Sequence, residues 1–232
     1  MFSLPAVPRL RGVELLDDPG VSSELMNRSM SDVARANALF GGRRAAMAEL
    51  KPVMQASDRS LSLLDVGTGR GDIPAAAKIT AKRLGLDLWT IGFDLSLPLV
   101  TENRDSNDVV TRGDALHLPF RDKSVDIVMA SQMLHHFPFD EAVVVVREMS
   151  RVARKMAIIS DLRRSVFAAA GIWAASFPLG FHPVSRHDGL VSVMRGFVPN
   201  ELIQIVKTAT GIQPDVTHRL GFRLTASWTP AS

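Results

Sequence analysis

The sequence predicts an α/β protein whose β-sheet is mostly parallel. Five short apolar runs alternate with longer segments of helical periodicity, the order typical of β-α-β units. Nearly every position in these runs is apolar, as in strands buried on both faces of a parallel sheet. With 232 residues, 46% of them hydrophobic, the chain can bury a large core. The predicted strands are 61–66, 88–94, 108–110, 125–131 and 156–160.

Two helices are predicted before the first strand. Apolar residues recur at helical spacing over 23–40. Gly41 and Gly42 are expected to end that helix, because glycine readily adopts the backbone conformation that terminates helices. A second helix is expected over 43–55.

Further helices are predicted between and after the strands. Asp140 is the expected N-cap of the helix before the fifth strand. The C-terminal run over 216–229, interrupted by Gly221, predicts an antiparallel hairpin that closes the sheet edge. The helices expected in this part of the chain are 73–84, 140–152 and 199–209.

The order of these elements predicts a main domain with two additions. Residues 1–58 are expected to form an N-terminal helical cap and residues 59–232 the main domain. Within the latter, the long connection over 161–196 is expected to be a helical cover over the substrate. A glycine and a proline interrupt its apolar run, which favours a buried or lid segment over a membrane-spanning helix.

Composition argues against several classes of function. The chain has no cysteine, so it has no disulfide framework, thiolate nucleophile or thiolate metal site. Its net charge is only +3, and the sequence pI of about 9.7 is high largely because no tyrosine or cysteine titrates before lysine. We therefore expect no nucleic-acid partner. The N-terminus lacks a signal-peptide pattern, so a cytoplasmic protein is expected.

The glycine-rich turn after the first strand is the most informative segment. Glycines let the chain turn tightly from strand to helix and let a ligand approach the backbone closely. A dinucleotide fingerprint has glycine where this chain has Asp72, and a carboxylate there would repel a pyrophosphate. The turn therefore favours a cationic ligand without phosphates. Its candidate binding residues, within LLDVGTGRGD (63–72), are Asp65, Gly67, Thr68, Gly69 and Gly71.

Two more acidic residues stand at the ends of the next predicted strands. Asp94, followed by Leu95, ends the second strand, where a carboxylate can accept hydrogen bonds from both hydroxyls of a ribose. Asp114, followed by Ala115, comes just after the third strand and is well placed for an exocyclic adenine amine. One such acid alone is usually a surface residue, so the ordered set of turn and acids carries the prediction.

Four motifs together resemble those of the class I S-adenosylmethionine-dependent methyltransferases, within them the UbiE-like and methyltransferase-domain enzymes of small-molecule metabolism. The resemblance implies a Rossmann-like fold with a seven-stranded, mostly parallel sheet, and S-adenosylmethionine as the cofactor. It covers about 60–160 and rests on DVGTGRGD (65–72), GFDLS (92–96), GDALHLPFRDKSVDIVMASQMLHHF (113–137) and REMSRVARKMAIISD (147–161).

The resemblance also implies roles for the residues of these motifs. The glycines of the turn would line the methionine and ribose portions of the cofactor, with Asp65 organising a water or the amino group. Asp94 would hold the ribose, and the Asp-Ala pair after the third strand would recognise adenine. Ser131 and Gln132 would lie beside the cofactor at the end of the fourth strand.

Methyl transfer to a hydroxyl requires a group that accepts its proton. His136 follows the fourth strand, at the edge where ligands of open α/β folds bind. A structural role is the alternative for His136 and also for its neighbour His135. The second candidate is His187, with Asp188 as its orienting carboxylate. The alternative for that pair is a polar turn.

Both ends of the chain suggest a substrate class. The stretches ELLDDP (14–19) and SRHDGLVSVMRGFVP (185–199) resemble methyltransferase-domain proteins encoded near type III polyketide synthases, which implies a phenolic or quinol polyketide acceptor. Large apolar residues after the fifth strand could wall a pocket for such a molecule, although core packing explains them equally. They are Phe167, Ile172, Trp173, Phe177 and Phe181.

The function expected is therefore O-methylation of a small hydrophobic hydroxyl compound, aromatic or polyketide. C-methylation of a quinol and a catalytically inactive partner subunit that binds the cofactor are the alternatives. Asp72 and the lack of a Tyr-x-x-x-Lys pair disfavour an NAD-dependent reductase. The absence of tyrosine also excludes the Asn-Pro-Pro-Tyr motif of DNA amino-methylases. No metal is expected, because the fourth strand's end lacks an acidic cluster.

Overall fold

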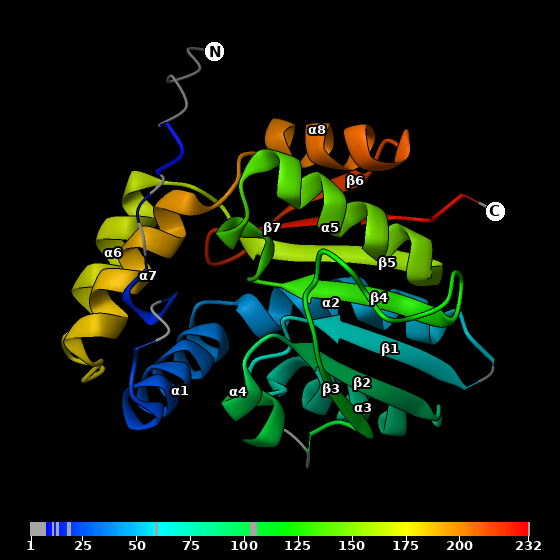
Figure 1. Ribbon diagram of the computed structural model, residues 1–232, viewed down its shortest axis with the longest axis horizontal. Coiled ribbons are helices and arrows are strands. Elements are labelled where there is room, and N and C mark those ends of the chain that lie inside the picture. Colours follow the sequence, from blue (N-terminus) through cyan, green and yellow to red (C-terminus); the bar gives the residue numbers. More distant parts are fainter. Residues whose placement is uncertain are drawn as a thin grey trace.

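The computed structural model describes residues 8–10, 12, 14–17, 20–58, 60–102 and 106–231 (Figure 1). Its strands are β1 (Leu61–Val66), β2 (Leu88–Asp94), β3 (Val109–Arg112), β4 (Val125–Ser131), β5 (Ala153–Leu162), β6 (Asp215–Arg219) and β7 (Arg223–Trp228). They form one seven-stranded sheet in the order β3-β2-β1-β4-β5-β7-β6. Strands β1 to β5 are parallel, and β7 runs antiparallel to both of its neighbours. The predicted fold class is confirmed.

The strand bounds follow the prediction closely, with two differences. β3 begins one residue later and ends two residues later than the predicted 108–110. Asp108, just before it, accepts hydrogen bonds from the backbone and hydroxyl of Thr90 at 2.8 and 3.0 Å. β5 is longer than 156–160 at both ends, since β4 pairs with it from Ala153 and β7 pairs with it as far as Leu162. The C-terminal hairpin is confirmed, with Gly221 at a positive φ of 78° in its turn.

Helices cover both faces of the sheet and its C-terminal edge (Figure 1). One face carries α2 and α3, and the other carries α5 and α8. Helices α1, α6 and α7 lie together beyond the strand ends. The helix bounds are α1 (Ser23–Leu39), α2 (Gly42–Gln55), α3 (Asp72–Arg83), α4 (Leu97–Glu102), α5 (Phe139–Val152), α6 (Val166–Ser176), α7 (Pro183–Arg195) and α8 (Pro199–Thr210), with short 3-10 helices η1 (Leu15–Asp17) and η2 (Leu134–His136).

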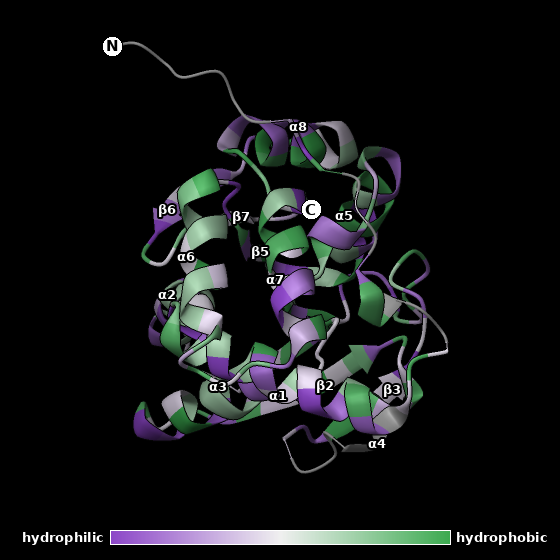
Figure 2. Cartoon of the chain, turned by 90° about the vertical axis from the view of Figure 1, so that its left-hand side faces the viewer, coloured by the Kyte–Doolittle hydropathy of each residue, from purple (hydrophilic) through white to green (hydrophobic). Residues whose placement is uncertain are grey.

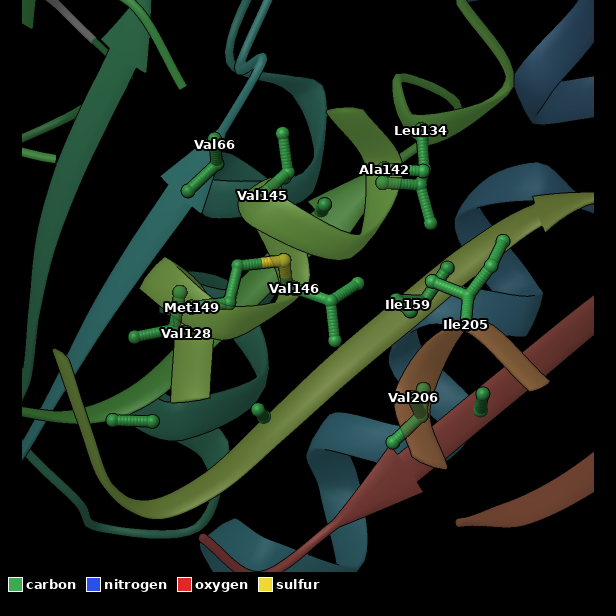
Figure 3. Packing of buried hydrophobic residues seen from close by; sticks show 14 of the residues in the cluster. Val66, Val128, Leu134, Ala142, Val145, Val146, Met149, Ile159, Ile205 and Val206 are labelled. Carbon is green, nitrogen blue, oxygen red and sulfur yellow. The ribbon is translucent and has the colours of Figure 1, made fainter. Parts of the chain in front are cut away.

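Alternating strand residues build a separate core on each face of the sheet. Leu64 and Val128 pack with α5 and α8 in the cluster that Figure 3 shows from close by. Their neighbours Leu63 and Ile127 pack against α2 and α3. Full burial of such a side chain contributes roughly 1.5–3 kcal/mol, so both helical layers are firmly held. Helix α2 belongs to the predicted N-terminal cap, yet it packs on the sheet of the main domain. The domain boundary after residue 58 therefore stays a prediction.

Two predicted helix ends are wrong in detail. The N-cap of α5 is Pro138, not Asp140, because the helix already begins at Phe139. Asp140 lies in the first turn, where its charge still interacts favourably with the helix N-terminus. Gly41 separates the first two helices, with a φ of 82°, but Gly42 is already the first residue of α2.

The connection after β5 forms the expected helical cover, consisting of α6 and α7. Figure 2 shows this side of the molecule, where α6 is hydrophobic along most of its length. In the described part of the chain, no helix has both the length and the apolar character needed to cross a membrane. The cover is joined to α1, because Asp32 accepts a hydrogen bond from the His182 backbone at 2.9 Å and the hydroxyls of Ser29 and Ser185 lie 3.2 Å apart.

Candidate functional site

A cavity of about 830 Å³ lies at the carboxyl ends of the parallel strands, under the helical cover formed by α6 and α7. The strand order reverses between β1 and β4, and open α/β sheets bind ligands at such a switch point. Every predicted cofactor residue except Gly71 lies on the cavity wall. The residues brought together there are Asp65, Gly67, Thr68, Gly69, Asp94, Leu95, Asp114, Ala115, Ser131 and Gln132.

The glycine-rich turn has the backbone geometry that its sequence predicts. Gly67, Gly69 and Gly71 have φ values of 71°, 55° and 72°, which strongly favour glycine. A Cβ on Gly67 would lie 2.5 Å from Cγ of Met133, whereas a Cβ on Gly69 would meet no described atom within 4 Å. Gly71 is close-packed against Ser106 instead of facing the cavity. The turn therefore leaves open space at its middle glycine, where a ligand can approach the backbone.

Buried polar atoms beside this turn indicate a polar ligand. Oδ1 of Asp65 and Oγ of Ser131 have no hydrogen-bond partner among the described residues, although buried polar groups are normally paired. Burial raises the pKa of the Asp65 carboxyl to about 8, and the charges of Asp72 and Asp94 act in the same direction. A ligand ammonium would favour the ionised form. These residues fit the amino acid portion of S-adenosylmethionine.

The carboxylates of Asp94 and Asp114 are held by backbone hydrogen bonds. Asp94 accepts from the N–H groups of Gly69 and Ser96, both at 2.9 Å. Asp114 accepts from the N–H of Leu116 at 2.9 Å. A carboxylate offers about four acceptor sites, so each retains capacity for the hydroxyls or amine of a nucleoside.

The side chain of Gln132 links three parts of the fold. Its backbone has a positive φ of 52°, and its amide donates to Oδ1 of Asn37 in α1 and accepts from Nη1 of Arg223 in β7. Arg223 is 4% exposed and also lines the cavity. Arg223 was not among the predicted site residues, although an arginine within the apolar run of a strand was a usable signal.

His135 lines the cavity and forms a buried pair with a carboxylate. Nδ1 of His135 lies 2.7 Å from Oδ1 of Asp161, at the end of β5. Burial by itself raises the pKa of Asp161, but the charge and hydrogen bond of His135 and the N–H of Leu162 hold it below its usual value. An ionised Asp161 accepts the Nδ1 proton, which leaves the Nε2 lone pair of His135 available. In the described part of the chain, that Nε2 atom has no hydrogen-bond partner.

His136 and Glu14 complete this group. The His136 ring stacks on His135 with centroids 4.4 Å apart. The Glu14 carboxylate lies 3.8 Å from Nε2 of His135 and 4.0 Å from Nε2 of His136. The three ligand atoms lie within 4.8 Å of one another, so a small inward shift would let them hold a transition metal with bonds of about 2.1 Å. Ser192 and Arg195 already hydrogen-bond to Glu14 at 2.8 and 3.2 Å, and the guanidinium opposes a cation there.

The structure does not bring His187 to the cavity. It lies within α7, where sequence analysis allowed a polar turn, and its side chain is 48% exposed and off the cavity wall. Its Nδ1 lies 2.8 Å from Oδ1 of Asp188. The Asp188 carboxylate lines the cavity but accepts hydrogen bonds from the backbone of Leu15 and Leu16 at 2.8 and 3.0 Å. It therefore anchors the N-terminal segment. Of the ELLDDP stretch (14–19), residues 18 and 19 lie outside the described residues.

Three of the five predicted apolar cover residues line the cavity, namely Phe167, Ile172 and Phe181. Trp173 and Phe177 instead form an edge-to-face pair with centroids 4.9 Å apart, and each is about half exposed. The inner face of the cover is therefore an apolar wall opposite the polar strand ends.

Comparisons with known proteins agree with this geometry. Residues 64–160 match the family described as Methyltransferase domain. The demethylmenaquinone methyltransferase of Roseiflexus sp. (strain RS-1) is 32% identical over 173 residues, which are 68% of this chain and 69% of that protein. The 27-O-demethylrifamycin SV methyltransferase of Amycolatopsis mediterranei (strain S699) is 36% identical over 109 residues, 44% of this chain and 36% of that protein.

Solved structures show the same fold. The magnesium protoporphyrin IX methyltransferase of Synechocystis PCC 6803 with bound SAM has a TM-score of 0.55 at 12% identity, covering 94% of this chain and 89% of that one. The cofactor of the protein described here is S-adenosylmethionine, as its motifs predict. Because the turn, the strand-end acids and a relative matched over two thirds of its length all agree, the chain belongs to the class I S-adenosylmethionine-dependent methyltransferases.

Proposed function

We propose that the protein transfers a methyl group to a hydroxyl oxygen of a small hydrophobic acceptor, aromatic or polyketide. The observation that carries this proposal is the pairing of His135, which lines the cavity, with the buried carboxylate of Asp161. A hydroxyl becomes a good nucleophile as its proton leaves. A histidine whose Nδ1–H is held by a buried carboxylate can accept that proton on Nε2, as in a catalytic triad.

The cofactor supplies a methyl group on a sulfonium, which needs no further activation. The chain contributes position: Asp65 would hold the ammonium of the cofactor and Asp94 its ribose. The Asp114–Ala115 pair would hold the adenine. Ser131 and Gln132 would orient the methionine portion at the end of β4. Fixed geometry of this kind supplies a large part of the rate of a bimolecular transfer.

His136 is the second candidate for the proton acceptor. It also lines the cavity, and its side chain is 33% exposed, against 3% for that of His135. His135 is favoured by its buried partner Asp161, which fixes both the ring and its tautomer. His187, which lies outside the cavity wall, is not included in this proposal.

The apolar cover supports an aromatic or polyketide acceptor. Phe167, Ile172 and Phe181 would contact its carbon skeleton and keep water out of the transfer. The relatives do not decide which atom is methylated, since one is named for demethylmenaquinone and another for 27-O-demethylrifamycin SV. C-methylation of a quinol is the second candidate, favoured by the first of these relatives, because the same base could generate a nucleophilic carbon.

The test is methyl transfer from S-adenosylmethionine labelled in its methyl group to a panel of phenols and quinols. We expect labelled methyl ethers, identified by mass spectrometry and NMR, and their loss in His135→Ala. His218→Ala, in the peripheral strand β6, is the matched control and should retain turnover. Products methylated only on carbon would favour the second candidate. Cofactor binding without turnover on any acceptor would favour the inactive partner subunit.

A further inference from the structure

Arg223 is a buried cation that has no acidic partner within the described residues. It begins β7, is 4% exposed and lines the cavity. Its Nε–H donates to the carbonyl of Phe40 at 3.4 Å, and its Nη1–H donates to Oε1 of Gln132. Both acceptors are neutral. Two of the five N–H donors of the guanidinium are thus used, and its Nη2 atom donates to no described residue.

This arrangement is costly unless a ligand completes it. Burial lowers the pKa of Arg223 to about 10, so the side chain stays charged at neutral pH. A buried charge normally pairs with an opposite charge, because desolvation is otherwise uncompensated. The acid whose charge opposes this lowering of the pKa is Asp161, whose carboxylate is already hydrogen-bonded to His135. The missing counter-ion therefore points to an anion in the cavity.

Arg223 stands on a strand away from those that carry the cofactor acids. The cofactor acids Asp65 and Asp94 stand on β1 and β2, whereas β7 lies beyond β5 in the sheet. Arg223 pairs in register with Leu162, the residue after Asp161. Arg223 and His135 line the same cavity, so one acceptor that spans it can contact both side chains.

We propose that the acceptor carries a carboxylate and that Arg223 binds this carboxylate while the acceptor hydroxyl faces His135. This inference rests on the proposed function. A guanidinium suits a carboxylate in particular, because the two planar groups can form two parallel hydrogen bonds. The acceptor class then narrows to aromatic or polyketide hydroxy acids. Phe167 and Phe181 contact the apolar part of such a molecule, and Arg223 determines its orientation.

The test is a binding measurement that needs no turnover. Wild-type protein saturated with S-adenosylhomocysteine is titrated calorimetrically with 4-hydroxybenzoate and with its methyl ester, which differ in the charge of one group. We expect the acid to bind at least about tenfold more tightly than the ester. In Arg223→Gln this preference should disappear, because the affinity for the acid falls while the affinity for the ester is unchanged. Arg223→Lys should recover part of the preference for the acid. Arg163→Gln, at the same sheet edge but off the cavity wall, is the matched control.

Three results would overturn the inference. Equal affinity of the wild type for acid and ester would do so without any variant, so a folding defect in Arg223→Gln cannot hide the answer. A preference that survives in Arg223→Gln would place the anion site elsewhere. Weaker binding of S-adenosylhomocysteine by this variant, with 5′-methylthioadenosine unaffected, would assign Arg223 to the cofactor's own carboxylate. Acid preference without methyl transfer would instead count against the proposed function alone.

Discussion

Nδ1 of His135 lies 2.7 Å from Oδ1 of Asp161, and both side chains are buried. His135 follows β4 and Asp161 lies near the end of the neighbouring parallel strand β5, and the register pairs Ser131 with Ser160. A second contact joins the N–H of His135 to Oδ2 of Asp161 at 3.2 Å. Asp161 therefore fixes both the backbone and the ring of His135, and this leaves Nε2 as the ring nitrogen without a hydrogen-bond partner among the described residues.

Asp161→Asn should lower turnover strongly while sparing the cofactor. The amide can no longer stabilise the protonated histidine or hold its tautomer, so we expect kcat to fall about 10²- to 10³-fold. The affinity for S-adenosylhomocysteine should stay within about twofold, since the Asp161 carboxylate hydrogen-bonds to His135 and Leu162 and to none of the predicted cofactor residues. Steady-state kinetics and calorimetry check the two halves. A parallel loss of cofactor binding would mean that Asp161 only maintains the fold.

Asp161 should also make the protein sensitive to acid. Its pKa is lower in the folded state than in the unfolded chain. Its contribution to stability is therefore present above the ordinary aspartate pKa and is lost as pH falls through the folded value. Between pH 6 and pH 3, wild type should lose more of its melting temperature than Asp161→Asn. Parallel loss in the two proteins would contradict this assignment.

Asp94→Ala should weaken cofactor binding. If the carboxylate holds both ribose hydroxyls, its removal should raise the Kd for S-adenosylhomocysteine at least about tenfold. Asp122→Ala is the matched control, because that carboxylate is exposed and far from the cavity wall. Calorimetry with S-adenosylhomocysteine, and separately with NADH, makes the measurement. Equal affinity in wild type and Asp94→Ala would remove the ribose assignment, and binding of NADH would contradict the reading of the glycine turn.

Asp65 should couple cofactor binding to proton release. Its pKa of about 8 means that the carboxyl is largely protonated at pH 7 in the cofactor-free protein, and the cofactor ammonium should ionise it. Calorimetry of wild type at pH 7 in buffers of different ionisation enthalpy should then show release of close to one proton, and Asp65→Asn should show less. Identical proton release in both proteins would separate Asp65 from the ammonium.

The same pKa shift predicts an effect on stability of the opposite sign to that of Asp161. A carboxyl whose pKa is raised by folding contributes stability below its unfolded pKa, and this is lost as pH rises through the folded value of about 8. Cofactor-free wild type should therefore lose melting temperature relative to Asp65→Asn between pH 5 and pH 9. The gap should narrow when S-adenosylhomocysteine is added. A constant gap across this range would contradict the shift.

Local patterns were enough to predict the cofactor half of the site. The turn through Gly67 and Gly69 and the strand-end acid Asp94 are consecutive features of β-α-β units, so spacing along the chain fixes their places in space. The acceptor half depends on contacts between distant residues. Asp161 stood at the end of a matched motif, but its pairing with His135 follows only from the adjacency of β4 and β5.

Side-chain direction was the other limit of sequence analysis. His187 and Asp188 are neighbours in the sequence, yet the phase of α7 turns one toward solvent and the other toward the cavity. Glu14 lies far from His135 in the sequence, and no periodicity could bring them together. Arg223 illustrates the same limit. The sequence does not show that this arginine is buried, so it does not show that an acidic partner is lacking.

Glu14 should make the enzyme sensitive to zinc. Its carboxylate and the Nε2 atoms of His135 and His136 lie within 4.8 Å of one another, so a small shift could close them around an ion with bonds of about 2.1 Å. Bound zinc would occupy the lone pair that accepts the proton. We therefore expect micromolar Zn²⁺ to inhibit wild type, Glu14→Gln to be less sensitive, and EDTA to leave activity unchanged. Loss of activity in EDTA, with recovery on adding a divalent ion, would show instead that the three residues form a catalytic metal centre and that His135 is a ligand, not the proton acceptor.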